Sequence, residues 1–352
     1  MSTTTTETAA TPAARSGNPA PARAMTPVRG LIRATLRVHQ SALWFWGLLV
    51  VLTAGGLVWA AGPVVDAAWA EYVRSGCATR DYCPTGPVYS HYGLAVNLGF
   101  AVLTIAPALI GAWAGGALIA RELESGTAKL AWTQSVTPTR WLAANLTVPA
   151  ALIVSGTVLL TLLNRLVWWR GERLRHALGN QDWFDYSTFT GNGTLATAYA
   201  LLALALGVLA GLLIRRSLPA LAAGFVGVAV FMSIFRTQRH ALWPVETLVS
   251  KTPDPNWTGE LVDRGIVLTS GDRVSNAACV DVSCGRSDVA GYYADFHPSS
   301  HFWSLQLVET GIVLGITALL VLAAFHLLRR RTGGSASPRT GAGSSPRTGG
   351  TP

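Results

Sequence analysis

Six long apolar stretches constrain the fold of this chain more than any other feature. They cover residues 43–61, 94–120, 142–164, 195–214, 217–235 and 305–328. At a rise of 1.5 Å per residue, roughly 20 apolar residues let a helix cross the ~30 Å hydrocarbon core of a bilayer. The second stretch is the clearest, because no residue from Leu94 to Ala120 carries a charge. We therefore expect an all-α integral membrane protein with six transmembrane helices.

Composition agrees with a membrane protein. The 352 residues are 50% hydrophobic and only 13% charged, and their mean hydropathy is +0.36. The 36 glycines suit close helix packing, and the 13 tryptophans suit anchoring at the membrane interface. The net charge of +9 could point to nucleic acid, but the basic residues lie beside the apolar stretches and in the tails, without a groove-reading motif. No nucleic-acid partner is expected.

The chain divides into four predicted parts. Residues 1–27 and 329–352 are low in complexity and are expected to be disordered cytoplasmic tails. Residues 28–42 form an amphipathic helix in projection, and such a helix lies in the inner interface against membrane lipids. Residues 43–328 are the six-helix domain, with a long external loop before the last helix.

Basic residues beside the spans predict the orientation. Those on one side are Arg29, Arg33, Arg37, Arg215, Arg216, Arg329, Arg330 and Arg331. Because basic residues collect on the cytoplasmic side, both tails are expected in the cytoplasm, with the protein in the plasma membrane. The loops at 62–92 and 237–302 are then external. One external loop breaks the rule, because residues 165–175 hold four arginines.

The four cysteines fit the same orientation. Cys77 and Cys83 lie in the first external loop, and Cys279 and Cys284 lie in the last. Two local disulfides are expected in an oxidising compartment, although four cysteines allow three pairings. A metal site is not expected, because the two pairs lie on distant loops and neither has CxxC spacing.

Small residues are expected to bring the helices together. The spacing GxxxG occurs in three of the apolar stretches, and its glycines are Gly111, Gly115, Gly207, Gly211, Gly311 and Gly315. Glycines one turn apart let helix backbones approach closely, so these positions predict a compact bundle.

Catalytic signatures are missing from the sequence. No central position of a span is charged, and the chain has no HExxH, GxSxG or P-loop motif. His297 and His301 are four residues apart, but no third ligand is evident, so they are expected to be ordinary loop residues rather than metal ligands. Catalysis and ion-coupled transport usually need buried ionisable groups. We expect no cofactor and no enzyme activity, and any transport would take its energy from another subunit.

The segment between the second and third stretches, residues 121–141, predicts a lever. The second helix is expected to pass beyond the membrane to Glu124 and to stop at Gly126, which suits a left-handed cap. A short helix follows over about 128–136, and Thr137 and Pro138 then fit the N-cap and first position of the third span. A force on the short helix would move both spans together.

This segment, RELESGTAKLAWTQSVTPTRW, resembles the membrane permease subunits of ABC transporters of the type-2 (ABC-2) exporter family. HPSSHFWSLQLVETGI at 297–312 is similar to the start of their last span, and the organisation of residues 29–328 also matches. The resemblance implies that residues 28–42 are the elbow helix before the first span. It also implies short re-entrant helices within 237–302 that close an outer gate.

The resemblance further implies that the loop after the second span docks into an ATPase subunit. The residues carried over to this contact are Arg121, Glu122, Glu124, Gly126, Thr127, Trp132 and Gln134. For Glu122 and Glu124 the alternative is a solvated helix end, which their charge alone would favour. We expect an export permease that dimerises with a second copy or a paralogue, works with separate ATP-binding subunits and catalyses no covalent chemistry.

The substrate is expected to be amphipathic or apolar, such as a drug, an antibiotic or a lipid, because the spans offer no counter-ion. One alternative is a non-transporting membrane scaffold or assembly protein, which would not need a docking loop. The other is an intramembrane enzyme, against which the missing catalytic groups argue.

Overall fold

The computed structural model describes residues 40–77, 86–133, 136–179, 181–253, 256–276 and 287–333. Within them, six helices are long and apolar enough to cross a membrane, so the predicted membrane fold is confirmed. They run over Leu43–Arg74, Pro87–Glu124, Pro138–Arg170, Leu195–Ile214, Ser217–Ala241 and Ser299–Thr332. Most of the predicted elbow helix and of the two predicted tails lies outside the described residues. Only residues 40–42 of the elbow helix and 329–333 of the C-terminal tail are described.

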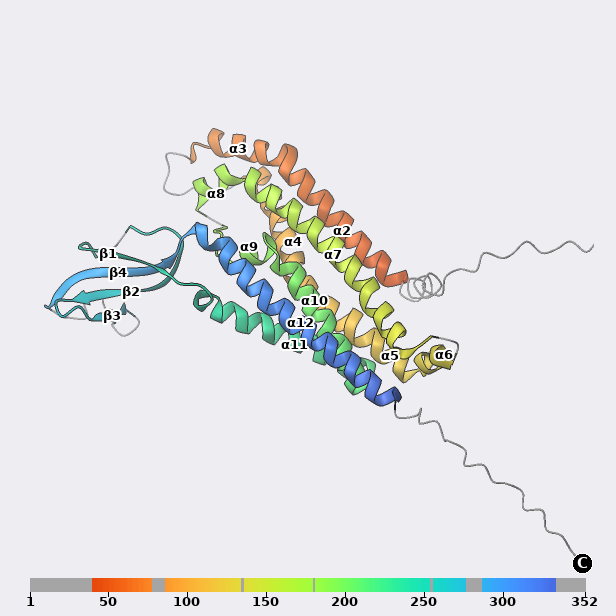
Figure 1. Cartoon of the computed structure of the whole chain (residues 1–352). Helices are drawn as coiled ribbons and strands as arrows, with labels where there is room; N and C mark the ends of the chain where they lie inside the picture. The colour runs from red at the N-terminus through yellow and green to blue at the C-terminus, as the bar shows by residue number, and fades with distance from the viewer. Residues whose placement is uncertain are drawn as a thin grey trace, which may run out of the picture.

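The first two spans are built from several helical segments. The first consists of α2 (Gln40–Trp59), the π-helical turn η1 (Ala60–Val64) and α3 (Val65–Arg74). The second consists of α4 (Pro87–Ile110), the π-helical turn η3 (Gly111–Ala117) and α5 (Leu118–Glu124). Gly62 has non-helical torsion angles, φ −90° and ψ −112°, directly before Pro63. The proline breaks the helical hydrogen-bond ladder, and α3 bends away from the axis of α2 (Figure 1).

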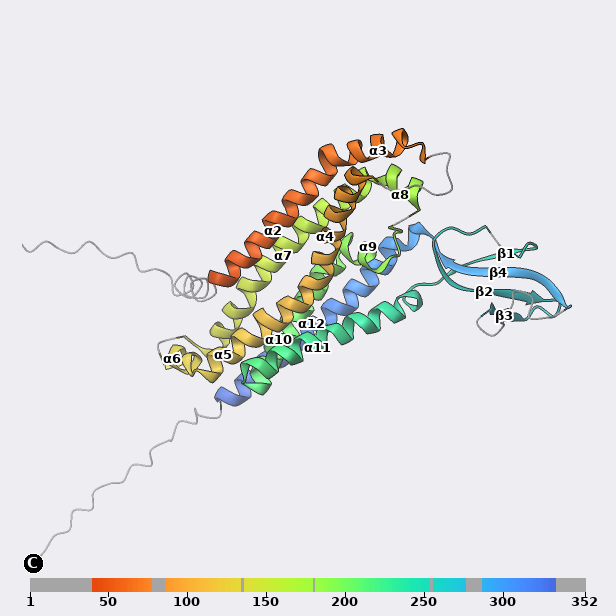
Figure 2. The same cartoon turned by 180° about the vertical axis from the view of Figure 1, so that it is seen from behind.

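The other elements follow in chain order. The helices are α6 (Thr127–Thr133), α7 (Pro138–Arg170), α8 (Glu172–Leu178), α9 (Tyr186–Gly191), α10 (Leu195–Ile214), α11 (Ser217–Gln238), the 3₁₀ turns η4 (Arg239–Ala241) and η6 (Ser299–His301), and α12 (Phe302–Thr332). The described chain starts with α2 and ends with α12 at one end of the bundle, beside α6 (Figures 1 and 2). We name this end the α6 end and the opposite end the sheet end.

The central helix of the bundle is α10. In its most apolar window 61% of the residues are buried, against 17–39% in the other five spans. It contacts α4, α7, α11, α12 and η3. Its sequence is almost wholly alanine, leucine and glycine, which allows neighbours on every side. In a bilayer lipid is as apolar as leucine, so this packing is stabilised by close van der Waals contact rather than by the hydrophobic effect.

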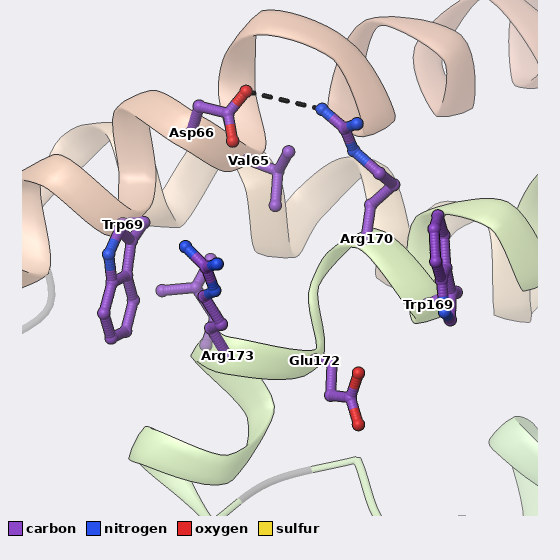
Figure 3. Close-up of a pocket in the computed structure, with 8 residues that line it drawn as sticks. Val65, Asp66, Trp69, Trp169, Arg170, Glu172 and Arg173 are labelled. Carbon is purple, nitrogen blue, oxygen red and sulfur yellow. Dashed lines mark hydrogen bonds and ion pairs between the residues drawn. The ribbon is translucent and has the colours of Figure 1, made fainter.

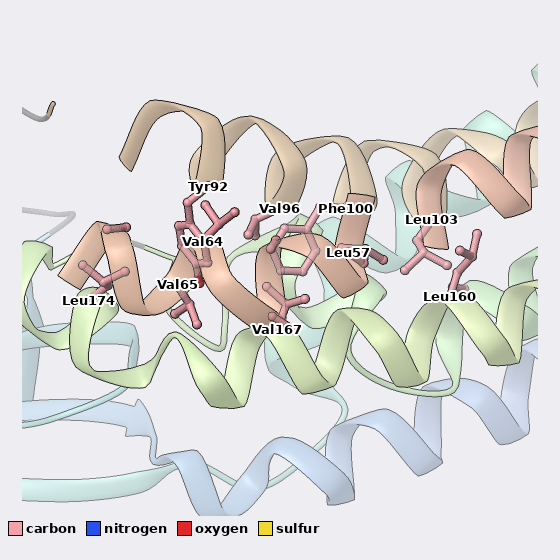
Figure 4. Close-up of a cluster of buried hydrophobic side chains, with 14 residues drawn as sticks. Leu57, Val64, Val65, Tyr92, Val96, Phe100, Leu103, Leu160, Val167 and Leu174 are labelled. Atoms are coloured by element: carbon pink, nitrogen blue, oxygen red, sulfur yellow. The ribbon is translucent and has the colours of Figure 1, made fainter. Parts of the chain in front are cut away.

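Three clusters of buried side chains hold the spans together. One joins spans 1, 2 and 3 toward the sheet end and includes Leu57, Phe100 and Val167 (Figure 4). A second joins spans 4, 5 and 6, with Ala108 of the second span. The third, toward the α6 end, takes in α6 as well as spans 2, 3, 4 and 6. At the sheet end, α3, α8 and the last turn of α7 surround a small pocket (Figure 3).

A four-stranded antiparallel sheet projects beyond spans 5 and 6 (Figures 1 and 2). Its strands are β1 (Glu246–Ser250), β2 (Glu260–Leu268), β3 (Arg273–Ser275) and β4 (Val289–His297), in the order β1-β4-β2-β3. Strand β4 is central, and Tyr293 and Ala294 on it are buried.

The sheet corrects the expectation for the loop before the last helix. Re-entrant helices were expected within 237–302, but its described residues form strands and two short 3₁₀ turns, besides the end of α11. The cause lies in composition, because β2 and β4 are rich in valine, isoleucine and tyrosine, which favour a pleated surface. The membrane domain is helical as predicted, and the sheet must be added to the all-α description.

Candidate functional site

The segment that links the second and third spans adopts the predicted break and short helix. Helix α5 ends at Glu124, and Gly126 then takes the left-handed conformation, with φ +75°. Glycine has no Cβ to clash there, so it ends the helix at little cost. Helix α6 follows at once and is described over Thr127–Thr133, and Val136, the predicted last residue, is not helical. Gln134 lies outside the described residues.

The start of the third span follows its local signals. Thr137 is the N-cap, and its side-chain oxygen accepts a hydrogen bond of 3.4 Å from the backbone N–H of Arg140. Pro138 occupies the first helical position, where its missing N–H leaves no broken bond. The third span therefore begins at a defined residue directly after the α6 segment.

Three side chains join α5, α6 and α7 into one unit, which we name the aromatic brace: Glu122, Trp132 and Trp141. The indole N–H of Trp141 donates a hydrogen bond of 2.7 Å to Oε2 of Glu122. The ring of Trp132 meets that of Trp141 edge to face at 5.7 Å. Trp141 is buried, with 3% of its surface exposed. A hydrogen bond to a charged group is worth about 1.5–3 kcal/mol, and such a ring pair about 0.5–1.5 kcal/mol.

A second link joins α5 to the fifth span. Oε2 of Glu124 accepts a hydrogen bond of 3.2 Å from the backbone N–H of Ser217, at the start of α11. The N-cap residue of α11 is Arg216, whose side chain makes no capping bond. A carboxylate at a helix N-terminus satisfies a free N–H and compensates the helix dipole. Glu124 thus caps α11 from outside, so α5 is tied to spans 3 and 5.

The outward face of α5 and α6 carries residues other than the brace. Arg121, Thr127 and Lys129 are exposed. Leu130 is also exposed, with 62% of its surface accessible. Of the seven residues expected to dock, Glu122 and Trp132 point into the brace, whereas Arg121 and Thr127 are on this outward face, with Glu124 exposed at the end of α5.

Sequence reasoning missed Lys129 and Leu130, although a signal for them was present. Ala128 is buried, and Trp132 follows it by four residues on the same face of α6. Residues four apart share a helix face, so a residue two positions along lies on the opposite one. Leu130 satisfies that condition.

A buried ion pair, also missed, fixes the sheet end. Nε of Arg239 lies 2.9 Å from Oε2 of Glu309, with side-chain exposures of 5% and 0%. The hydroxyl of Tyr199 donates a hydrogen bond to Oε1 of the same carboxylate. The Arg239 guanidinium also sits 4.0 Å from the centre of the Phe189 ring. The pair joins spans 4, 5 and 6, and the sequence had placed Arg239 in a loop because the apolar stretch stops at residue 235.

A comparison with protein families matches the part of the chain that contains the aromatic brace and ends at Arg239. A model described as "ABC-2 membrane transporter related" matches residues 47–239, which is more than half of the chain. The chain belongs to the ABC-2 membrane transporter related family. Among curated proteins and among solved structures, no match was found.

Membership fixes the broad character of the protein. A family of membrane transporters together with six apolar helices makes this ABC-2 member a multi-pass membrane protein of permease type. The matched residues include the aromatic brace and Lys129, whereas the sheet and α12 lie beyond them. The resemblance drawn from the 121–141 segment is thereby confirmed.

The GxxxG glycines of this ABC-2 chain occupy two kinds of environment. A Cβ on Gly115 would lie 2.6 Å from the carbonyl oxygen of Leu204 and 2.7 Å from Cα of Gly207. A Cβ on Gly211 would lie 3.1 Å from the carbonyl oxygen of Gly116. The second and fourth spans therefore touch backbone to backbone.

The sixth span differs, because among the described residues no atom lies within 4 Å of a Cβ built on Gly311 or Gly315. A role of these two glycines in helix packing stays a prediction. Gly111 lies in η3, and its surroundings are not described.

The predicted disulfides fall mostly outside the described residues. Cys77 is buried, and Cys83, Cys279 and Cys284 are not described, so the disulfides stay a prediction. Nδ1 of His297 lies 3.1 Å from Nδ1 of His301, and its Nε2 lies 3.0 Å from the carbonyl oxygen of His240. Among the described residues, no group of three or more histidine, cysteine, aspartate or glutamate side chains could hold a metal ion.

A mostly apolar pocket of about 360 Å³ lies between α7, α10 and α12. Leu162, Leu201 and Leu314 line it, together with Arg165. Nη1 of Arg165 donates a hydrogen bond of 2.9 Å to the carbonyl of Asn192, and its guanidinium sits 4.7 Å from the ring centre of Trp303. The pocket opens beside exposed leucines, so an apolar molecule could enter it from the lipid.

Proposed function

We propose that this chain is the transmembrane permease subunit of an ABC exporter, driven by ATP that a separate ATPase subunit hydrolyses. It lies in the plasma membrane with the α6 end and both tails in the cytoplasm and the sheet outside. The observation that carries the proposal is the braced α6, which presents Lys129 and Leu130 outward while Trp132 and Trp141 fasten it to the third span. No P-loop occurs in the 352 residues, which supports a separate ATPase.

Force on α6 has two routes into the membrane. One runs from Trp132 to Trp141 at the start of α7, and the other runs from α5 through Glu124 to the start of α11. Packed helices move as rigid bodies with discrete arrangements, so a small displacement at their ends tilts them along their length. Closure of the ATPase would thus move spans 3 and 5 relative to the central α10.

The pocket between α7, α10 and α12 supports the proposed substrate class. Its volume of about 360 Å³ and apolar lining suit part of an amphipathic or apolar molecule, such as a drug, an antibiotic or a lipid. The guanidinium of Arg165 is already engaged by Asn192 and Trp303, so it offers little to a strongly anionic substrate. A second copy or a paralogue would pack on the open side of α12 at Gly311 and Gly315.

The experiment separates docking from force transmission. Lys129→Glu reverses an exposed charge on α6, and Lys251→Glu is its matched control, because Lys251 is the other lysine of the chain and is exposed beyond the bundle, after β1. Trp141→Phe keeps an aromatic ring but removes the indole N–H that donates a hydrogen bond to Glu122. Each variant is purified with its ATPase partner, and complex recovery, stimulated ATP hydrolysis and export into inverted vesicles are measured.

We expect Lys129→Glu to lose recovery and stimulation, because an interface depends on charge complementarity, while Lys251→Glu behaves like wild type. Trp141→Phe should keep recovery and lose part of the stimulated hydrolysis and export. If Lys129→Glu and Leu130→Ala both retain full recovery and full stimulation, the docking face lies elsewhere. If no ATPase is recovered with the wild-type chain, a scaffold role replaces the permease proposal.

A further inference from the structure

The four arginines between residues 165 and 175 fall into two groups. Arg165 and Arg175 have partners within the protein, since Nε of Arg175 donates a hydrogen bond of 3.2 Å to the carbonyl of Trp168 and its guanidinium stacks 3.7 Å from that ring. Arg170 and Arg173 instead line the pocket at the sheet end (Figure 3). Two arginines thus line one pocket. The positive-inside rule does not explain them, because the sheet end is expected to be external.

The pocket has the lining of an interfacial binding site. It measures about 300 Å³ and lies between α3, the end of α7 and α8. Trp69 and Trp169 stand on opposite sides of it in Figure 3. Trp169 is 66% exposed, whereas Val65 and Leu174 are buried members of the lining. Tryptophan favours the headgroup region, because its ring is apolar and its N–H is polar.

The charged residues that line the pocket are two arginines and two acids, and they differ in how they are paired. Nη2 of Arg170 lies 3.4 Å from Oδ2 of Asp66, but the side chains are 43% and 79% exposed, so this pair is weak. Glu172 contacts His176 at 3.7 Å. Among the residues that the structure describes, no carboxylate pairs with Arg173. One guanidinium is therefore free, and a second is held only by an exposed contact.

The depth of the pocket follows from the length of α7. Trp141 and Trp169 are about 28 residues apart in this helix, which is a distance of about 42 Å. A bilayer with its headgroups is about 40–45 Å thick. With Trp141 at one interface, Trp169 and Arg170 lie at the level of the headgroups of the other leaflet. Leu162 and Leu166, one to two turns nearer the membrane centre, are 62% and 44% exposed and face lipid chains.

We propose that this pocket binds the phosphate headgroup of an anionic phospholipid in the leaflet at the sheet end. The planar guanidinium fork matches two phosphate oxygens, and Arg170 and Arg173 approach one site from neighbouring turns. Basic pockets between helices at headgroup depth recognise lipid headgroups in this way. The acyl chains would follow the exposed leucines of α7. The bound lipid would join the bent α3 of the first span to α7 and α8.

The test uses the full chain in detergent, stripped of lipid and titrated with phosphatidylglycerol, phosphatidylcholine or inorganic phosphate. Binding is read by native mass spectrometry. Arg173→Gln should weaken phosphatidylglycerol binding about tenfold, because a charge-assisted hydrogen bond is lost. Arg264→Gln, at an exposed arginine of β2, is the matched control and should bind like wild type.

Asp66→Asn and Arg170→Gln make a sharper pair, because both break the same ion pair. A purely structural contact would give both variants the same effect. The proposal requires opposite effects: Arg170→Gln weakens phosphatidylglycerol binding, whereas Asp66→Asn frees a guanidinium and leaves binding as tight or tighter. Unchanged binding in Arg173→Gln, or equal losses in Asp66→Asn and Arg170→Gln, would overturn the proposal. Full displacement of the lipid by inorganic phosphate would assign the site to a soluble anion instead.

Discussion

Breaking the buried Arg239–Glu309 pair should cost far more stability than removing both of its members. Glu309 is fully buried and receives Arg239 at 2.9 Å as well as the Tyr199 hydroxyl. Glu309→Gln leaves the guanidinium buried without its ion-pair partner. Removal of one partner of such a pair costs about 3–5 kcal/mol, because the remaining charge cannot reach water.

The double variant Arg239→Met/Glu309→Leu removes both charges and keeps the volume roughly constant. Replacement of a buried pair by apolar residues is often close to neutral. The cost that remains is the Tyr199 hydroxyl without its acceptor, about 1–3 kcal/mol. Adding Tyr199→Phe should recover that part. The expected order of stability is therefore wild type and the triple variant above the double variant, with Glu309→Gln lowest.

Equilibrium unfolding in mixed micelles with increasing SDS, followed by tryptophan fluorescence, gives these free energies. The exposed Arg170–Asp66 pair is the control, and Arg170→Met should cost below about 1 kcal/mol. If the double variant loses the sum of the losses of Glu309→Leu and Arg239→Met, the two charges do not stabilise each other and the assigned pair is wrong.

Three further outcomes test the orientation, the cysteines and the sheet. In intact cells, thiol labelling after reduction should reach Cys279, and labelling only after membrane disruption would reverse the proposed orientation. Peptide mass spectrometry without reduction should find Cys77 linked to Cys83 and Cys279 linked to Cys284, and other pairings would refute the local loops. Burial raises the pKa of Glu260 despite opposing charges from Arg239, His297 and His240, so the folded sheet favours its neutral form. Its stabilising contribution is then present at low pH and is lost as the pH rises through the raised pKa. Glu260→Gln should slow hydrogen exchange of β2 at neutral pH and have little effect at low pH.

The sequence predicted the membrane domain because one strong constraint acts there. A helix must satisfy its backbone internally in lipid, so length and apolar content locate a span without knowledge of its neighbours. The ends of the spans were harder, since α7 runs on through Arg165 to Arg170 and α11 to Gln238. A charged residue ends an apolar stretch of sequence. It does not end the helix when its side chain finds a partner in the fold.

The sheet and the aromatic brace depend on contacts that sequence patterns do not specify. Strands β2 and β4 pair across a long connection, and nothing in either strand alone names the other. Gly126 and Thr137 were predicted correctly because a left-handed cap and an N-cap are local. Glu122 and Trp141 are 19 residues apart, and their hydrogen bond exists only once α5 and α7 are side by side. The family resemblance marked Glu122 as a docking residue and its charge alone favoured a solvated helix end, whereas its carboxylate accepts a hydrogen bond from Trp141.

Two clusters of buried side chains meet in the sheet half of the bundle. One is built mainly from spans 1, 2 and 3 and the other mainly from spans 4, 5 and 6, but Ala196 of span 4 belongs to the first and Ala108 of span 2 to the second. The central α10 therefore packs against both groups of spans. In the proposed mechanism, force from α6 moves α7 through Trp141 and α11 through Glu124, in both cases relative to α10. Both α7 and α10 line the apolar pocket, so this motion would change the fit of a bound substrate without any charge entering the membrane.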